Sequence, residues 1–121
     1  MNVLIVESRS DLSALWKRHL ERQQMNVAAM ATQDEAIGYL SMNPVDIIIL
    51  DLVLEDGSAF AVADYANFRQ PDARVIFVTN TSFFSDGSIF AHSSNAQAFL
   101  PSSTAPEDLA AMIEHYGSDA R

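Results

Sequence analysis

The chain has 121 residues, 49% of them hydrophobic, which is enough for one domain with one core. It contains no cysteine, which excludes disulfides, thiolate zinc sites and cysteine nucleophiles. Its formal net charge of −9 repels nucleic acid and anionic lipid, so we expect no direct contact with either. No apolar run approaches the roughly 18 residues that cross a bilayer, and the first residues lack the basic region of a signal peptide. We therefore expect a cytoplasmic protein.

Three short apolar runs are predicted to be buried strands, at residues 3–6 (VLIV), 47–50 (IIIL) and 75–78 (VIFV). Continuous runs rich in β-branched residues are typical of strands that are covered on both faces of a parallel sheet. Residues 26–31 and 98–100 are weaker strand candidates.

Apolar residues recur at helical spacing between these strands. The predicted buried stripes consist of Leu12, Leu15, Trp16, His19 and Leu20; Ile37 and Leu40; Phe60, Ala61, Tyr65 and Phe68; and Leu109, Met112, Ile113 and Tyr116. Capping boxes at residues 32–35 and 104–107 are predicted to start the second and last of these helices. Residues 80–96 are rich in Ser, Asn and Thr, which predicts only a short or labile helix.

Strands therefore alternate with helices along the whole chain. Such alternation predicts an α/β protein with three α/β/α layers, a five-stranded parallel sheet and right-handed crossovers. We expect a single domain over residues 1–121. Ligands of such sheets bind beyond the carboxyl ends of the strands.

Polar side chains follow the predicted strands at those carboxyl ends. Glu7 and Ser8 follow the first strand, Asp51 ends the third, Thr79 follows the fourth, and Ser102 comes after the last. Two carboxylates and several hydroxyls at one edge of a sheet suit Mg²⁺, which takes oxygen ligands and usually keeps some water. A metal ion beside Asp51 would neutralise an incoming phosphate and allow the carboxylate to attack phosphorus.

Four sequence blocks resemble the receiver domain of bacterial two-component response regulators. They are VLIVES (3–8), VDIIILDLVLEDGSAF (45–60), VIFVTNTS (75–82) and AFLPSS (98–103), in the family's order. The resemblance covers essentially the whole chain and implies a flavodoxin-like strand order of 2-1-3-4-5. We expect a stand-alone receiver, with no output domain.

The resemblance also implies a role for individual residues. Asp51 corresponds to the aspartate that accepts a phosphoryl group in phosphorelay signal transduction. Glu7, Asp51 and the backbone carbonyl of Val53 correspond to the Mg²⁺ ligands. Thr79 corresponds to the hydroxyl that hydrogen-bonds the phosphoryl group, and Phe99 to the aromatic switch of the last strand.

This sequence departs from the family pattern at several of the same positions. Ser8 replaces the second acid of the metal pair, and Ser102 replaces the lysine that pairs with the phosphoryl group. Glu55 replaces a loop proline and adds negative charge near the acceptor. The only lysine in the chain, Lys17, lies in the first predicted helix. We therefore consider the hypothesis that Arg9 replaces either the metal or the missing lysine.

The resemblance implies a signalling domain rather than an enzyme, with any self-phosphorylation or dephosphorylation slow and incidental. Its expected partners are a histidine kinase or phosphotransfer protein and a downstream protein, which would bind the face formed by residues 80–96, strand 98–100 and the last helix. A homodimer is a further possibility. One alternative is a degenerate receiver that binds a partner without phosphorylation. Another is a flavodoxin-like mononucleotide binder, but Gly38, Gly57, Gly87 and Gly117 are too scattered to form a phosphate loop.

Overall fold

The computed structural model describes residues 1–79 and 96–119, except for the side chains of 96–99 and 117–119. The elements of this part, in chain order, are β1 (Asn2–Val6), α1 (Ser10–Arg22), β2 (Asn26–Met30), α2 (Gln33–Met42), β3 (Ile47–Asp51), α3 (Ala59–Arg69), β4 (Arg74–Thr79), β5 (Ala96–Pro101) and α4 (Pro106–Asp119). The helix predicted over residues 80–96 falls almost wholly outside the described residues.

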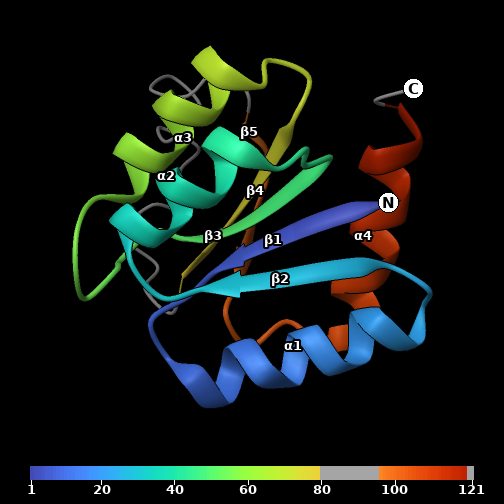
Figure 1. Ribbon diagram of the computed structural model, residues 1–121. Helices are drawn as coiled ribbons and strands as arrows, with labels where there is room; N and C mark the ends of the chain where they lie inside the picture. The colour runs from blue at the N-terminus through green and yellow to red at the C-terminus, as the bar shows by residue number, and fades with distance from the viewer. Residues whose placement is uncertain (80–95, 120–121) are drawn as a thin grey trace.

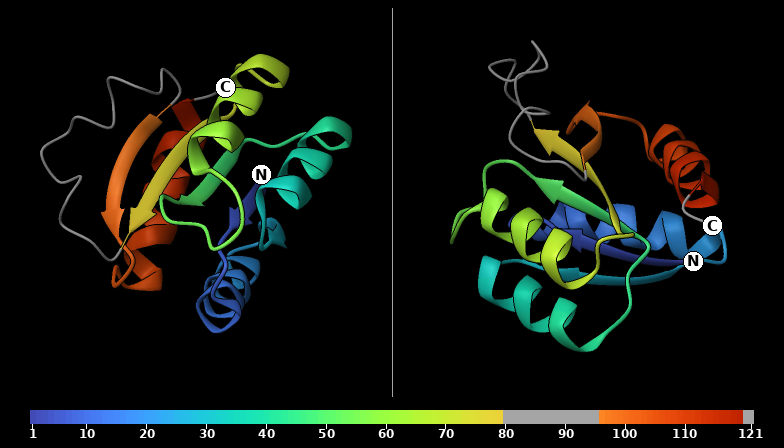
Figure 2. Two further views of the ribbon diagram at one scale, coloured as in Figure 1. Left: turned by 90° about the vertical axis from the view of Figure 1, so that its left-hand side faces the viewer. Right: turned by 90° about the horizontal axis from the view of Figure 1, so that it is seen from above.

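The strands form one parallel sheet with the order β2-β1-β3-β4-β5, which confirms the predicted order. Helices α1 and α4 cover one face of the sheet, and α2 and α3 cover the other (Figure 1). Seen from above in Figure 2, the sheet runs between the two helical layers. The predicted three-layer α/β/α architecture is therefore confirmed.

The two faces of the sheet carry separate hydrophobic clusters, because successive side chains of a strand point to opposite faces. Ile48 and Leu50 pack under α2 and α3, whereas Ile47 and Ile49 pack under α1 and α4. All four are fully buried, which is why this run is continuous in the sequence. Strand β2 lies at an edge of the sheet and is only partly buried, and its signal in the sequence is correspondingly weak.

The predicted buried faces of two helices are partly wrong. In α3 the buried residues are Ala59, Val62, Ala63 and Ala66, whereas Phe68 is 82% exposed. Small side chains allow the helix to approach the sheet closely, and the larger aromatic side chains are left at the sides of the contact. In α1, Trp16 and Leu20 are buried as predicted, but Leu15 is 46% exposed.

One of the two predicted capping boxes forms in part. The Thr32 hydroxyl accepts the backbone N–H of Glu35 at 3.2 Å, as predicted, whereas the Glu35 carboxylate accepts the N–H of Ala31, one residue before the N-cap, at 3.0 Å. The second prediction is wrong, because α4 begins at Pro106 and the hydroxyl of Thr104 donates to the carbonyl of Pro101.

The loop between β3 and α3 is fixed to the start of α2 by Gln33. Its backbone N–H donates to the carbonyl of Asp56 at 3.2 Å, and its side-chain oxygen accepts the N–H of Ser58 at 2.7 Å. Between these two contacts lies Gly57, with φ 103°, a conformation that side-chain-bearing residues rarely adopt. A Cβ at this position would also overlap the Gln33 side chain.

Gly57→Ala is therefore expected to lower the free energy of unfolding by about 1–3 kcal/mol. Gly38→Ala is the matched control, because Gly38 lies within α2 and a Cβ there meets nothing within 4 Å. That substitution is expected to stabilise the protein by roughly 0.5–1 kcal/mol. Urea unfolding of both variants measures the difference, and equal effects would contradict the role assigned to the loop.

Candidate functional site

Two carboxylates lie side by side at the carboxyl edge of the sheet, which faces the viewer in the left view of Figure 2. Val6 and Leu50 are Cα partners in the β1–β3 pairing, so the next residues, Glu7 and Asp51, leave their strands at the same level. Both are buried, at 1% and 8% exposure. The parallel sheet therefore brings together two acids that are 44 positions apart in the chain.

Burial strongly disfavours the charged form of Glu7. Burial is the largest cause that raises the pKa of Glu7 to about 7, and the adjacent Asp51 contributes to this increase through a hydrogen bond and through its charge. The backbone N–H of Arg9, 3.1 Å from Glu7 Oε2, offsets part of this increase in pKa. Glu7 Oε1 is buried and has no hydrogen-bond donor among the described residues. A proton or a cation between the two carboxylates would satisfy this atom.

The two acids open into a pocket of about 200 Å³, lined by Glu7, Ser8, Arg9, Asp51, Val53 and Glu55. The backbone N–H of Val53 donates to Asp51 Oδ1 at 3.0 Å, which fixes the orientation of that carboxylate. The pocket thus brings together Glu7, Asp51 and Val53, the three residues predicted to bind metal. In the described part of the chain, no three His, Cys, Asp or Glu side chains cluster closely enough to hold an ion by themselves.

Thr79 and Ser102 lie beside this pocket but do not line it. Thr79 is 2% exposed and comes one residue after Val78, the Cα partner of Asp51. The backbone N–H of Ser102 donates to the Thr79 carbonyl at 2.8 Å, which joins the ends of β4 and β5. The backbone of Phe99 pairs with Phe77 in the sheet, but its side chain lies outside the described part, so the predicted switch stays a prediction.

Comparison with known families identifies the class of protein. Residues 3–114 match the family described as the response regulator receiver domain. The chain belongs to this family. Receiver domains are signalling domains rather than classical enzymes; they typically bind Mg²⁺ and interact with histidine kinases or phosphotransfer proteins. No helix in the described residues is long and apolar enough to cross a membrane.

A curated relative agrees with this assignment. The response regulator PilR of Pseudomonas aeruginosa is 30% identical over 111 residues, which are 92% of this chain and 24% of PilR. This receiver domain thus spans about a quarter of that relative.

Solved structures share the fold. A CheY-like receiver from Methanospirillum hungatei superposes with a TM-score of 0.90 at 20% identity, covering 98% of this chain and 94% of the other. A Burkholderia pseudomallei response regulator, crystallised with a phosphorylated aspartic acid, calcium and citrate, has a TM-score of 0.83 at 23% identity, covering 98% and 69%.

Ser8, where the resemblance implies a second acid, links three loops of this receiver domain. Its hydroxyl donates to the carbonyl of Ala31 at 3.2 Å and accepts the backbone N–H of Glu55 at 2.9 Å. The loops after β1, β2 and β3 are thereby joined through one oxygen. Neither partner is near Ser8 in the sequence, so no local pattern could have predicted this role.

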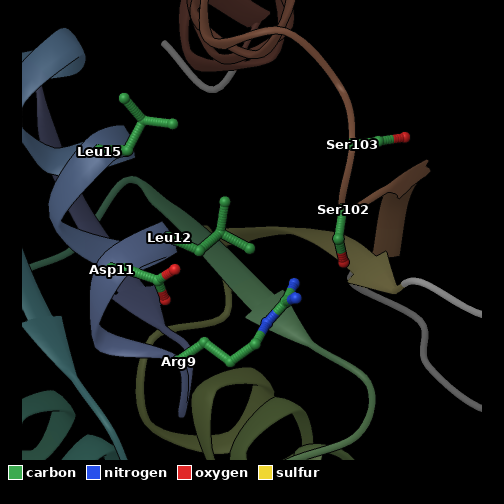
Figure 3. Close-up of a pocket in the computed structure, with 6 residues that line it drawn as sticks. All are labelled: Arg9, Asp11, Leu12, Leu15, Ser102 and Ser103. Atoms are coloured by element: carbon green, nitrogen blue, oxygen red, sulfur yellow. The ribbon is translucent and has the colours of Figure 1, made fainter.

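A second pocket of about 300 Å³ adjoins the acidic one and is lined by Arg9, Asp11, Leu12, Leu15, Ser102 and Ser103. In Figure 3 the Arg9 side chain extends from the start of α1 and its guanidinium points towards Ser102. Arg9 therefore lines both of these adjoining pockets, and the sequence alone could not indicate which way its side chain points.

Proposed function

We propose that this receiver domain accepts a phosphoryl group on Asp51 and acts in phosphorelay signalling. The observation that supports this most strongly is the buried pair of Glu7 and Asp51 at the edge of an open pocket. Burying two carboxylates together costs stability unless a counter-charge or proton accompanies them, so a purely structural role does not account for the pair.

The proposed reaction transfers a phosphoryl group from a phosphohistidine of the partner. A carboxylate oxygen of Asp51 attacks phosphorus, a new O–P bond forms, and the P–N bond breaks as its electron pair returns to the histidine. The hydrogen bond from the Val53 N–H to Asp51 Oδ1 holds the carboxylate in one orientation during this step. The Thr79 hydroxyl is proposed to donate to the transferred phosphoryl group.

The site is suited to Mg²⁺. Glu7 Oε1 is buried and lacks a donor, as expected of an oxygen whose partner is a cation. The carboxylates of Glu7 and Asp51, with the backbone carbonyl of Val53, would hold the ion. When bound, Mg²⁺ would neutralise charge on the phosphoryl oxygens.

The proposed partners follow from the family and the charge of the chain. A histidine kinase or phosphotransfer protein would supply the phosphoryl group, and a downstream protein or a second copy would bind the face that includes β5 and α4. The net charge of −9 disfavours nucleic acid as a direct partner. The absence of an output domain stays a prediction, as does a cytoplasmic location.

One observation favours the second candidate, a receiver that binds its partner without phosphorylation. The Ser8 oxygen is already engaged by Ala31 and Glu55, and the lysine position is occupied by Ser102. The site therefore has one acid and one lysine fewer than the family pattern implies.

Incubation with acetyl phosphate and Mg²⁺, followed by intact mass measurement, distinguishes the two candidates. We expect a mass gain of one phosphoryl group that disappears in Asp51→Asn and persists in Asp64→Asn, since Asp64 is exposed on α3. A folded protein with no donor-dependent gain would support the phosphorylation-independent candidate instead.

A further inference from the structure

Arg9 is the one arginine or lysine that lines either pocket in the described part of the chain. Lys17 pairs with Glu21 on α1 at 3.6 Å, and Arg69 donates to the carbonyl of Ser41. Arg74 begins β4 and so lies at the opposite edge of the sheet. Residues 80–95 contain no arginine or lysine. Among the described residues, Arg9 is therefore the basic side chain that borders the pocket of Asp51 and could pair with an anion bound there.

The guanidinium of Arg9 offsets the charge of the two carboxylates only in part. Its closest approach is 4.0 Å, from Nε to Glu7 Oε2, and 47% of the side chain is exposed. Glu7 Oε1 stays without a donor although Arg9 is adjacent. A side chain that replaced the metal would donate to both acids, as a guanidinium readily does. Instead the head group points towards Ser102 (Figure 3).

We propose that Arg9 pairs with the phosphoryl group carried by Asp51, in place of a lysine at position 102, and does not replace the metal ion. This inference rests on the proposed function. A phosphoryl group adds close to two negative charges to a pocket that already contains Glu7 and Glu55. The planar guanidinium can donate two parallel hydrogen bonds to phosphate oxygens, and from the start of α1 it borders the same pocket as Asp51.

Beryllium fluoride, a mimic of the phosphoryl group, tests this assignment when its affinity is measured by ¹⁹F NMR in the presence of Mg²⁺. We expect Arg9→Gln to weaken beryllium fluoride binding by roughly 10- to 100-fold, the loss of one or two charge-assisted hydrogen bonds. Arg9→Lys should recover part of that loss. Arg18→Gln is the matched control, because it removes the same charge from an exposed position of α1 and should leave binding unchanged.

The second measurement is the affinity for Mg²⁺ without beryllium fluoride. The Arg9→Gln protein should bind Mg²⁺ at least as tightly as the wild type does. Unchanged beryllium fluoride affinity in Arg9→Gln would overturn the inference while leaving phosphorylation of Asp51 intact. Weaker Mg²⁺ binding in Arg9→Gln, or beryllium fluoride binding by the wild type without Mg²⁺, would assign Arg9 to the metal position and also overturn it. Failure of the folded wild type to bind beryllium fluoride under any condition would reject the proposed function together with this inference.

Discussion

Glu7→Gln is expected to make the metal-free protein more stable than the wild type at pH 8, on the order of 2 kcal/mol. Burial and the adjacent Asp51 together raise the pKa of Glu7 from 4.5 to about 7 in the folded protein, so ionised Glu7 destabilises the fold. Glutamine has the same shape and no charge. Its amide can also donate to Asp51, which removes the unsatisfied oxygen at this position.

The same pKa determines how stability depends on pH. Between pH 4.5 and about 7 the folded protein keeps the Glu7 proton that the unfolded chain has released. Because the folded state binds more protons in this window, wild-type stability falls as pH rises through it, and the full cost is present above pH 7. Glu7→Gln should lack this component of the pH dependence, and below pH 4.5 the two proteins should be similar in stability.

Urea unfolding at pH 5 and pH 8 in the presence of a chelator measures this difference. Glu21→Gln is a suitable control, because Glu21 is exposed on α1 and its ion pair with Lys17 contributes at most about 1 kcal/mol. Added Mg²⁺ should reverse the order at pH 8, because the ion stabilises only the protein that retains both acids. A Glu7→Gln protein that is less stable than the wild type at pH 8 without metal would show that Glu7 stabilises the empty site.

The central strands could be predicted accurately because a strand that is buried on both faces consists of consecutive apolar residues. Residues 47–50 are apolar without interruption, and each of them is fully buried. Strand β5 extends two residues before the predicted start, since Ala96 and Gln97 lack the bulk that marks a core strand. The parallel arrangement then followed from the alternation of strands and helices, and the strand order from the family resemblance.

The buried faces of the helices were predicted less well, because a large apolar side chain is not necessarily a buried one. The aromatic residues of α3 formed the most apparent stripe, yet the sheet packs against its alanines and Val62. Phe60 is partly buried and packs against the core, and its ring centroid lies 6.1 Å from that of Phe77. A periodic pattern therefore located the helix, but close packing determined which of its faces is buried.

The site was predictable only where strand geometry determines it. Glu7 and Asp51 meet because adjacent parallel strands end at one edge, and this follows from residue positions alone. The engagement of Ser8 by Glu55 depends on a contact over 47 residues, and the position of Arg9 depends on a side-chain rotamer. Neither leaves a periodic or local signal in the sequence.

Ser8→Asp is expected to raise the affinity for Mg²⁺ by at least about tenfold, because a further carboxylate would border the pocket beside Glu7 and Asp51. The same change should lower the stability of the metal-free protein by roughly 1–3 kcal/mol. The new carboxylate can still accept the N–H of Glu55, but it cannot donate to the carbonyl of Ala31 and it adds a further acid to the pocket.

Ser8→Asn separates these two effects, since asparagine has the shape of aspartate without its charge. It should perturb the loop contacts to a similar degree and should leave Mg²⁺ affinity near that of the wild type. Thermal unfolding with and without Mg²⁺ is the measurement: Ser8→Asp should unfold at a lower temperature than the wild type without the ion and at a higher temperature in its presence. Equal Mg²⁺ affinity in Ser8→Asp and Ser8→Asn would mean that a carboxylate at position 8 does not reach the ion, because the hydrogen bond from Glu55 holds it towards the loop.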